Sequence, residues 1–371
     1  MLQRTPFYDY HVSHGGQMVD FAGWDMPIRY GSIIDEHHQV RTSGGLFDVS
    51  HMGRLRISGR HARRLLERVC IRRVSDMQPM QCRYTMVCNE RGGVMDDVIV
   101  NRFEEDDFLM VVNGANREKI VAHFQSVIAD RGYTVKLKDT TLDSAMIALQ
   151  GPKVMDLIGT VSSEVPTLKR FRFTVKNIMI AKLIVSRTGY TGENGVEVIV
   201  PAKLAQTALK MLLKESPETE GIVKPIGLGA RDTLRMEAGL PLYGNELHED
   251  LSAVAANMPF AMSLDKEDDD GAEPCIGLAA LREHAAQGVP RTLTGVLIEG
   301  RRSARGHMPV KMNGAEVGAI TSACVSPTLE RPIALALVDT DRIEAGAAVE
   351  IDAGGRTIEG TLAPLPLYTP S

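Results

Sequence analysis

Cysteine is scarce in this sequence, and its arrangement excludes two kinds of cross-linked protein. The chain has 371 residues and only five cysteines, at positions 70, 82, 88, 275 and 324. Five is an odd number, the spacings are irregular and no Cys-x-x-Cys pair occurs, which argues against a disulfide framework and against a zinc site. We therefore expect buried, reduced thiols, a cytoplasmic location and no bound metal.

Long apolar runs and an excess of positive charge are also missing. No apolar run approaches the roughly 20 residues that span a bilayer, and the first six residues show no apolar leader segment, so we expect neither a membrane protein nor a secreted one. Lys and Arg number 42 against 47 Asp and Glu, a formal net charge of −5. This balance argues against binding nucleic acid or an anionic membrane through bulk charge.

Several common catalytic signatures are absent as well. No Gly-x-Ser-x-Gly elbow occurs, so a serine hydrolase is not indicated. The glycine-rich segments lack the dinucleotide motif, which argues against a dehydrogenase. The histidines at 11, 14, 37 and 38 lack partner ligands at metal-binding spacing.

What remains is an ordinary globular composition, 44% hydrophobic and 24% charged. Strand-like and helix-like segments alternate over roughly the first 260 residues, which predicts an α/β or α+β body. After an acidic stretch and a short helix the chain becomes all-β, with hairpin turns expected at Asn313-Gly314 and Gly354-Gly355. We expect a small antiparallel barrel or sandwich there, and we divide the chain into a body, 1–280, and a C-terminal domain, 281–371.

The segment Gly92–Val100 combines a two-glycine turn with a strand that contains Asp96 and Asp97. Neighbouring side chains of a strand point to opposite faces, so one of the two acids is a candidate site carboxylate and the other is not. Acids between apolar strand residues are costly unless they are used. The alternative interpretation is a pair of turn aspartates.

The segment 186–197 places three glycines between two strands. Such glycines let the backbone approach a flat ligand closely. Tyr190 is suited to stack on that ligand and Glu197 to accept hydrogen bonds from it. The alternative is a long hairpin turn without a ligand.

The segment 227–239 reads as a helix with glycines at its start and Gly239 as its C-cap. Arg231 and Arg235 lie on one face of it, so both are candidates to point into one cleft. The alternative is a surface helix with a solvated basic face.

These segments, taken in order with several others, resemble a known family. Seven runs of residues resemble, in the same order, motifs of the glycine cleavage system T-protein (aminomethyltransferase) family. These runs are 19–27, 45–53, 92–97, 188–197, 228–237, 240–244 and 321–328. The resemblance covers nearly the whole chain. It implies an α+β fold, in which a multi-lobed folate-binding body of mixed sheets and helices is followed by a small antiparallel β-barrel.

The resemblance also implies a reaction and its participants. Tetrahydrofolate would bind in the body as co-substrate, and the lipoylated H-protein would carry the aminomethyl group; ammonia and 5,10-methylenetetrahydrofolate are the expected products. The family's essential acid aligns with Asp97, or with Asp96 if the alignment slips by one residue. The folate-binding positions correspond to the following five residues: Glu197, Arg231, Tyr190, Tyr84 and Met52.

Departures from the family pattern concern the carrier-facing side. Phe260 stands where a tryptophan is usual, Leu251-Ser252-Ala253 replaces a Thr-Thr-Pro-like stretch, and Asn101 replaces an aromatic residue. Two alternatives therefore stay open: another tetrahydrofolate-dependent one-carbon transferase or demethylase acting on a small amine or sulfonium donor, and a non-catalytic folate-binding protein. Retention of the acid Asp97 argues against the second.

Overall fold

The computed structural model describes residues 2–178, 181–212, 221–268 and 271–370. The chain divides into two compact units, each assembled from several segments. The first comprises 1–65, 76–84 and 98–232, and the second comprises 66–75, 85–97 and 233–371. In the described ranges no helix is long and apolar enough to cross a membrane.

The first unit is built on a six-stranded sheet in which two adjacent strands, Gly44–Asp48 and Ser144–Gln150, are almost completely buried. All neighbouring strands are antiparallel except the edge strand β14, which runs parallel to β4. The strands in spatial order are β11 (Phe173–Ile178), β12 (Ala181–Ser186), β13 (Gly195–Pro201), β10 (Ser144–Gln150), β4 (Gly44–Asp48) and β14 (Val223–Pro225).

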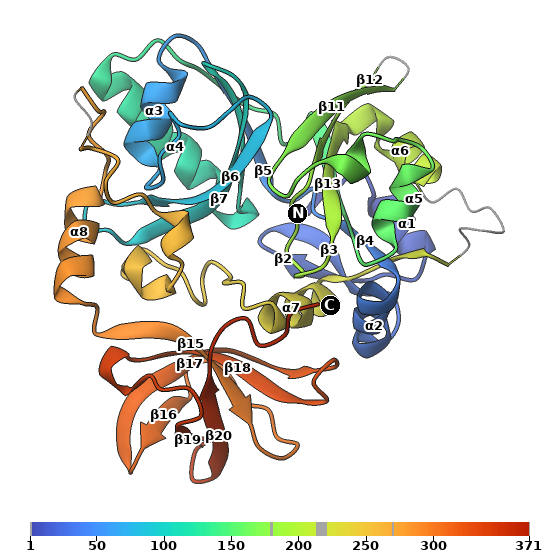
Figure 1. Cartoon of the computed structure of the whole chain (residues 1–371). Helices are drawn as coiled ribbons and strands as arrows, with labels where there is room; N and C mark the ends of the chain where they lie inside the picture. The colour runs from blue at the N-terminus through green and yellow to red at the C-terminus, as the bar shows by residue number, and fades with distance from the viewer. Residues whose placement is uncertain (1, 179–180, 213–220, 269–270, 371) are drawn as a thin grey trace. The chain divides into compact units, whose positions relative to one another are not determined.

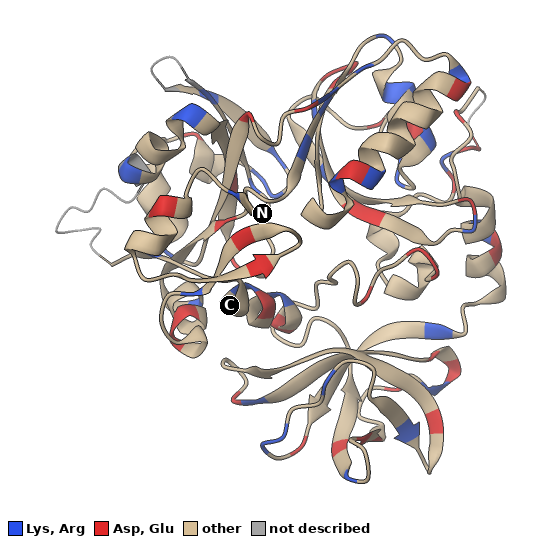
Figure 2. Ribbon diagram, turned by 180° about the vertical axis from the view of Figure 1, so that it is seen from behind, with Lys and Arg blue, Asp and Glu red and all other residues tan. Residues whose placement is uncertain are grey.

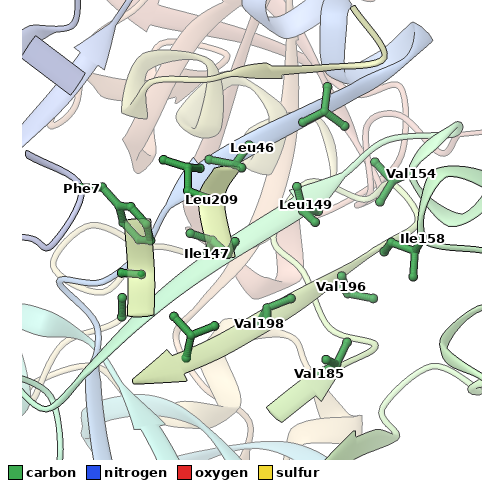
Figure 3. Close-up of a cluster of buried hydrophobic side chains, with 14 of the residues drawn as sticks. Phe7, Leu46, Ile147, Leu149, Val154, Ile158, Val185, Val196, Val198 and Leu209 are labelled. Atoms are coloured by element: carbon green, nitrogen blue, oxygen red, sulfur yellow. The ribbon is translucent and has the colours of Figure 1, made fainter. Parts of the chain in front are cut away.

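Alternate residues of these strands form an apolar core with short helices packed on it. Figure 3 shows Ile147 and Leu149 of β10 and Val196 and Val198 of β13 in one cluster with Phe7. Side chains that alternate along a strand face one side of the sheet, which is why residues two apart meet in this core. The helices of this part are α1 (Tyr8–Ser13), α2 (Ile33–Thr42), α5 (Val154–Gly159) and α6 (Ala205–Leu212).

Two further sheets accompany the first. A three-stranded sheet has the order β1 (Gln3–Arg4), β3 (Trp24–Arg29) and β2 (Gln17–Phe21). A five-stranded sheet has the order β6 (Gln81–Cys88), β7 (Val94–Glu104), β8 (Asp107–Val112), β5 (Gly53–Ser58) and β9 (Lys136–Asp139). The helices α3 (Ala62–Val69) and α4 (Arg117–Arg131) lie in sequence between strands of this five-stranded sheet. The boundary between the two units falls within α3, β6 and β7.

The second unit contains the expected barrel, which settles the choice between barrel and sandwich. Six antiparallel strands close on themselves (Figure 1). Asn313 and Gly314 both have positive φ, and so do Gly354 and Gly355, which confirms the two predicted hairpin turns. The strands in barrel order are β15 (Arg291–Ile298), β18 (Arg331–Asp339), β17 (Ala315–Ser326), β16 (Pro309–Met312), β19 (Ala348–Asp352) and β20 (Thr357–Ala363).

The barrel has an apolar interior and a surface of mixed charge. Its buried cluster includes Val296, Ile320, Ala336 and Ile351. Figure 2 shows acidic and basic residues interspersed along its strands and turns. The helix before it is α8 (Leu278–Gln287). The α+β class with a C-terminal antiparallel barrel is thus confirmed, while a division of the chain at residue 280 stays a prediction.

Candidate active site

Arg231 lies near the start of α7 (Leu228–Glu237), a helix whose position is fixed by its first residues. The amide of Gly227 donates to a carboxylate oxygen of Glu36 at 2.8 Å. A Cβ on Gly227 would come within 2.3 Å of the Ile28 carbonyl oxygen, so this close approach requires glycine. The guanidinium of Arg231 then lies 4.7 Å from the centre of the Tyr190 ring and 5.9 Å from that of Phe47.

The glycine-rich loop between β12 and β13 is held by a side chain from the end of β10. Gln150 Nε2 donates to the Thr188 carbonyl at 3.2 Å, and Gln150 Oε1 accepts from the Thr191 hydroxyl at 3.1 Å. A Cβ on Gly189 would lie 2.0 Å from Gln150 Oε1. The glycine therefore allows the loop to sit against Gln150, and this fixes the loop on either side of Tyr190.

Glu197 projects from β13 and joins this group. One of its carboxylate oxygens accepts a hydrogen bond from the Thr188 hydroxyl at 2.5 Å. Burial lowers the pKa of Arg231, and the negative charge of Glu197 opposes that effect. The guanidinium of Arg231 thus contacts the aromatic ring of Tyr190 and feels the charge of the Glu197 carboxylate, and all three residues belong to the first unit.

Arg54 fixes the turn between β4 and β5, which carries His51 and Met52. Its Nη1 donates to the carbonyls of Ser50 at 3.0 Å and Met52 at 2.5 Å. The other guanidinium nitrogens bond to the Thr141 carbonyl and to the hydroxyl and carbonyl of Ser144. Arg54 is completely buried, and burial lowers its pKa to about 10.

His51 is a buried, neutral histidine in that turn. Its ring packs edge to face on Phe21, with centroids 5.3 Å apart. Burial lowers the pKa of His51 to about 4, assisted by the positive charge of Arg231. At neutral pH the imidazole is therefore uncharged, with one ring nitrogen a donor and the other an acceptor.

A second hydrogen-bonded group lies just before this turn, at the end of β4. The carboxylate of Asp48 accepts from Thr5 at 2.6 Å, pairs with His11 Nε2 at 2.9 Å, and accepts from the Ser50 amide at 2.9 Å. Burial alone would raise the pKa of Asp48, but the bonds from His11, Ser50 and Thr5 hold it below its ordinary value. This network ties the start of the chain to the β4–β5 turn.

The two aspartates of the Gly92 segment both lie inside β7, so the alternative of two turn aspartates is wrong. Asp96 is completely buried, and Asp97 is half-buried on the opposite face, as strand alternation predicts. Gly93 makes the turn before them: a Cβ there would come within 1.8 Å of the Glu249 carbonyl oxygen. Both acids belong to the second unit, and the role of Asp97 stays a prediction.

Comparison with known proteins assigns both parts of the chain to the same family. Residues 7–266 match the N-terminal domain of glycine cleavage T-proteins, and residues 291–369 match the C-terminal barrel domain of these proteins. The aminomethyltransferase of Rubrobacter xylanophilus is 43% identical over 99% of this chain and 94% of its own length. The chain belongs to the glycine cleavage T-protein family.

Other members of the T-protein family support the assignment. An aminomethyltransferase of Desulfitobacterium hafniense is 38% identical over 99% of this chain and 98% of its own. The crystal structure of glycine cleavage system aminomethyltransferase T from Bartonella henselae superposes with a TM-score of 0.90 at 27% identity, covering 100% and 99% of the two chains. The protein is therefore an aminomethyltransferase, as the resemblance implied.

Of the residues predicted for folate, Arg231 contacts Tyr190 directly, and Glu197 acts on Arg231 electrostatically. Met52 lies in the turn that Arg54 holds, and Tyr84 is half-buried on β6. Arg235 was predicted to point into the same ligand cleft as Arg231. This is not supported, because Arg235 is buried and donates a hydrogen bond to Glu246 at 2.8 Å. For the same reason the alternative of a solvated basic face is wrong.

Sequence reasoning missed His51, Thr188, Gln150 and Arg54. Nothing in the neighbouring sequence marks His51 or Arg54 as functional, because both are simply polar residues that follow an apolar run. Gln150 offers more, because it closes the apolar run 145–149 and precedes Gly151, where a buried amide at a strand end needs partners.

Proposed function

We propose that this aminomethyltransferase moves the methylene carbon of an aminomethyl group from the dihydrolipoyl arm of an H-protein to tetrahydrofolate. Ammonia leaves, 5,10-methylenetetrahydrofolate forms and the dihydrolipoyl carrier is released. The observation that carries the proposal is the contact of Arg231 with the ring of Tyr190, together with the charge of Glu197 that acts on Arg231. It rests also on membership of the family.

The chemistry of this group fits tetrahydrofolate. Its pterin is flat and suits the ring of Tyr190. The amino and ring N–H groups of the pterin suit the carboxylate of Glu197, which accepts two parallel hydrogen bonds. Arg231 Nη1 is a buried donor without a partner among the described residues, and it needs an acceptor oxygen. Met52 and Tyr84 would complete the walls.

Tetrahydrofolate would supply the amine that attacks the carbon, so the chain needs no nucleophile of its own. Positive charge develops on the aminomethyl carbon as ammonia leaves. We assign Asp97 to this charge: a fixed carboxylate stabilises it and orients the folate nitrogens. Asp96 is the alternative, although its complete burial in β7 favours a structural role.

The test is ammonia release from an aminomethylated lipoyl carrier, with and without tetrahydrofolate. We expect release that depends on tetrahydrofolate and falls by about 10²–10³-fold in Asp97→Asn, while the variant still binds tetrahydrofolate in a titration. Asp96→Asn removes the same charge one residue away and decides between the two acids: a folate-binding variant that keeps ammonia release leaves the role to Asp97, whereas one that loses it while Asp97→Asn keeps it assigns the role to Asp96. If wild type binds tetrahydrofolate but releases no ammonia from the carrier, the carrier is wrong and small methyl donors should be tried instead.

A further inference from the structure

Two buried nitrogens in the candidate site have no hydrogen-bond partner among the described residues: Arg231 Nη1 and His51 Nδ1. Buried polar atoms in folded proteins nearly always have a partner, because an unpaired one costs free energy. The neighbouring Arg54 shows how completely this fold can pair a buried cation. Two unpaired atoms in one site therefore point to a ligand that pairs them.

The two atoms come from elements that lie against each other. Arg231 of α7 approaches the ring of Phe47, and Phe47 lies on β4, the strand that leads directly into the turn with His51. The turn leaves His51 little freedom, because a Cβ on Gly114 would lie 2.5 Å from the His51 carbonyl oxygen and 3.4 Å from its ring. Arg231 also lowers the pKa of His51, which keeps the imidazole neutral.

The chemistry of the pair selects the kind of atom that it binds. A guanidinium can only donate, so the partner of Nη1 must be an acceptor. A neutral imidazole can carry its proton on Nδ1 and donate as well. Two unpaired donors whose residues influence each other suit a carbonyl oxygen, and the carboxylate of Glu197, which acts on Arg231, suits N–H donors. The edge of a pterin offers this combination, an amino group and a ring N–H next to a carbonyl.

We propose that His51 Nδ1 and Arg231 Nη1 together donate hydrogen bonds to the pterin carbonyl oxygen of the bound folate. This inference rests on the proposed function, since it takes tetrahydrofolate as the ligand. It adds His51 to the residues that contact the co-substrate and gives its imidazole a defined tautomer. At position 51 an Asn side chain can place an N–H near the position of the His51 Nδ1 atom, whereas a Leu side chain cannot.

The experiment compares His51→Asn and His51→Leu by titration with tetrahydrofolate and with 6-methyltetrahydropterin, which keeps the carbonyl and lacks the tail. His51→Leu should bind both ligands about 10–100-fold more weakly, the range expected for a lost bond to a buried partner. His51→Asn should stay within about threefold of wild type. In turnover assays, His51→Leu should raise KM for tetrahydrofolate while kcat at saturation is largely kept.

A matched control is His123→Leu on α4, because His123 Nε2 is also buried without a partner among the described residues. It should leave both affinities unchanged. Unchanged affinity in His51→Leu overturns the inference, and so does equal loss in the Asn and Leu variants, which indicates a packing role. Loss with tetrahydrofolate alone places the oxygen in the tail and overturns the pterin assignment. If wild type binds neither ligand, the proposed function itself fails.

Discussion

Two arginines in the first unit, the buried Arg54 and the half-buried Arg231, use the same side chain in opposite ways. Arg54 is bonded to backbone carbonyls and a hydroxyl from two segments of chain, 50–52 and 141–144. Arg231 lies on aromatic rings and keeps one buried nitrogen without a partner among the described residues. Both have a pKa lowered by burial.

The difference in hydrogen bonding separates a structural arginine from a ligand-binding one. A cation that is fully hydrogen-bonded contributes to folding, because the bonds offset the cost of removing it from water. A cation that is buried but incompletely bonded is held at a cost, and a ligand can recover that cost on binding. We infer that Arg54 acts on stability and Arg231 on affinity, and mutations can separate the two.

The largest effect on stability is expected for Arg54→Leu. The change leaves the carbonyls of Ser50, Met52, Thr141 and Ser144 without this donor, so the free energy of unfolding should fall by roughly 3–5 kcal/mol. Denaturant titration measures it. Arg56→Leu on the same strand is the control: Arg56 pairs with Asp107 and is a third exposed, so its loss should cost about 1 kcal/mol or less. Equal losses in the two variants would contradict the assignment.

The next effect concerns ligand affinity. Arg231→Leu should weaken tetrahydrofolate binding by about 10–100-fold while changing the unfolding midpoint far less than Arg54→Leu does. Isothermal titration and thermal unfolding of the same preparations measure both. Arg170→Leu controls for charge in general, since Arg170 is exposed on the same unit. A variant at 231 that unfolds easily yet binds normally would reverse the comparison.

The next prediction concerns the dependence of stability on pH, through His51. Its pKa is about 4 when folded and about 6.5 when unfolded, so between these values the unfolded chain binds more protons. Stability should therefore fall as the pH drops from about 6.5 to 4, by at most roughly 3 kcal/mol from this group. His51→Asn should flatten the slope, whereas His307→Asn, on an exposed residue, should not. The charges that act on His51 are Arg231, Asp48 and Arg54.

Local patterns in the sequence predicted the regular elements well. The apolar runs at 109–112 and 146–149 are strands β8 and β10, and the glycine-bounded helix is α7 with Gly239 at positive φ after its end. Two hairpin turns of the barrel followed from residues that tolerate positive φ. Each of these features depends on residues that are close in sequence.

The contacts that build the site join residues far apart in sequence, and no local pattern encodes them. Arg54 bonds to residue 141, and Gln150 bonds to residues 188 and 191. Tyr190 and Arg231 were predicted to bind the same ligand, but their direct contact was not foreseen. Which buried polar atoms stay unpaired, as for His51, depends on every neighbour in space, so it can be found only in the structure.

The smallest effect is expected where two charges pair at the surface. Lys311 Nζ lies 2.7 Å from Asp352 and joins β16 to β19, and each side chain is about a third exposed. Their hydrogen bond raises the pKa of Lys311 and lowers that of Asp352, but water and salt screen such a pair, and the ordered side chains lose entropy. Lys311→Ala should shift the melting midpoint by less than about 1 °C. A loss of stability as large as that of Arg54→Leu would show that ion pairing alone, without burial, determines how much a cation stabilises this protein.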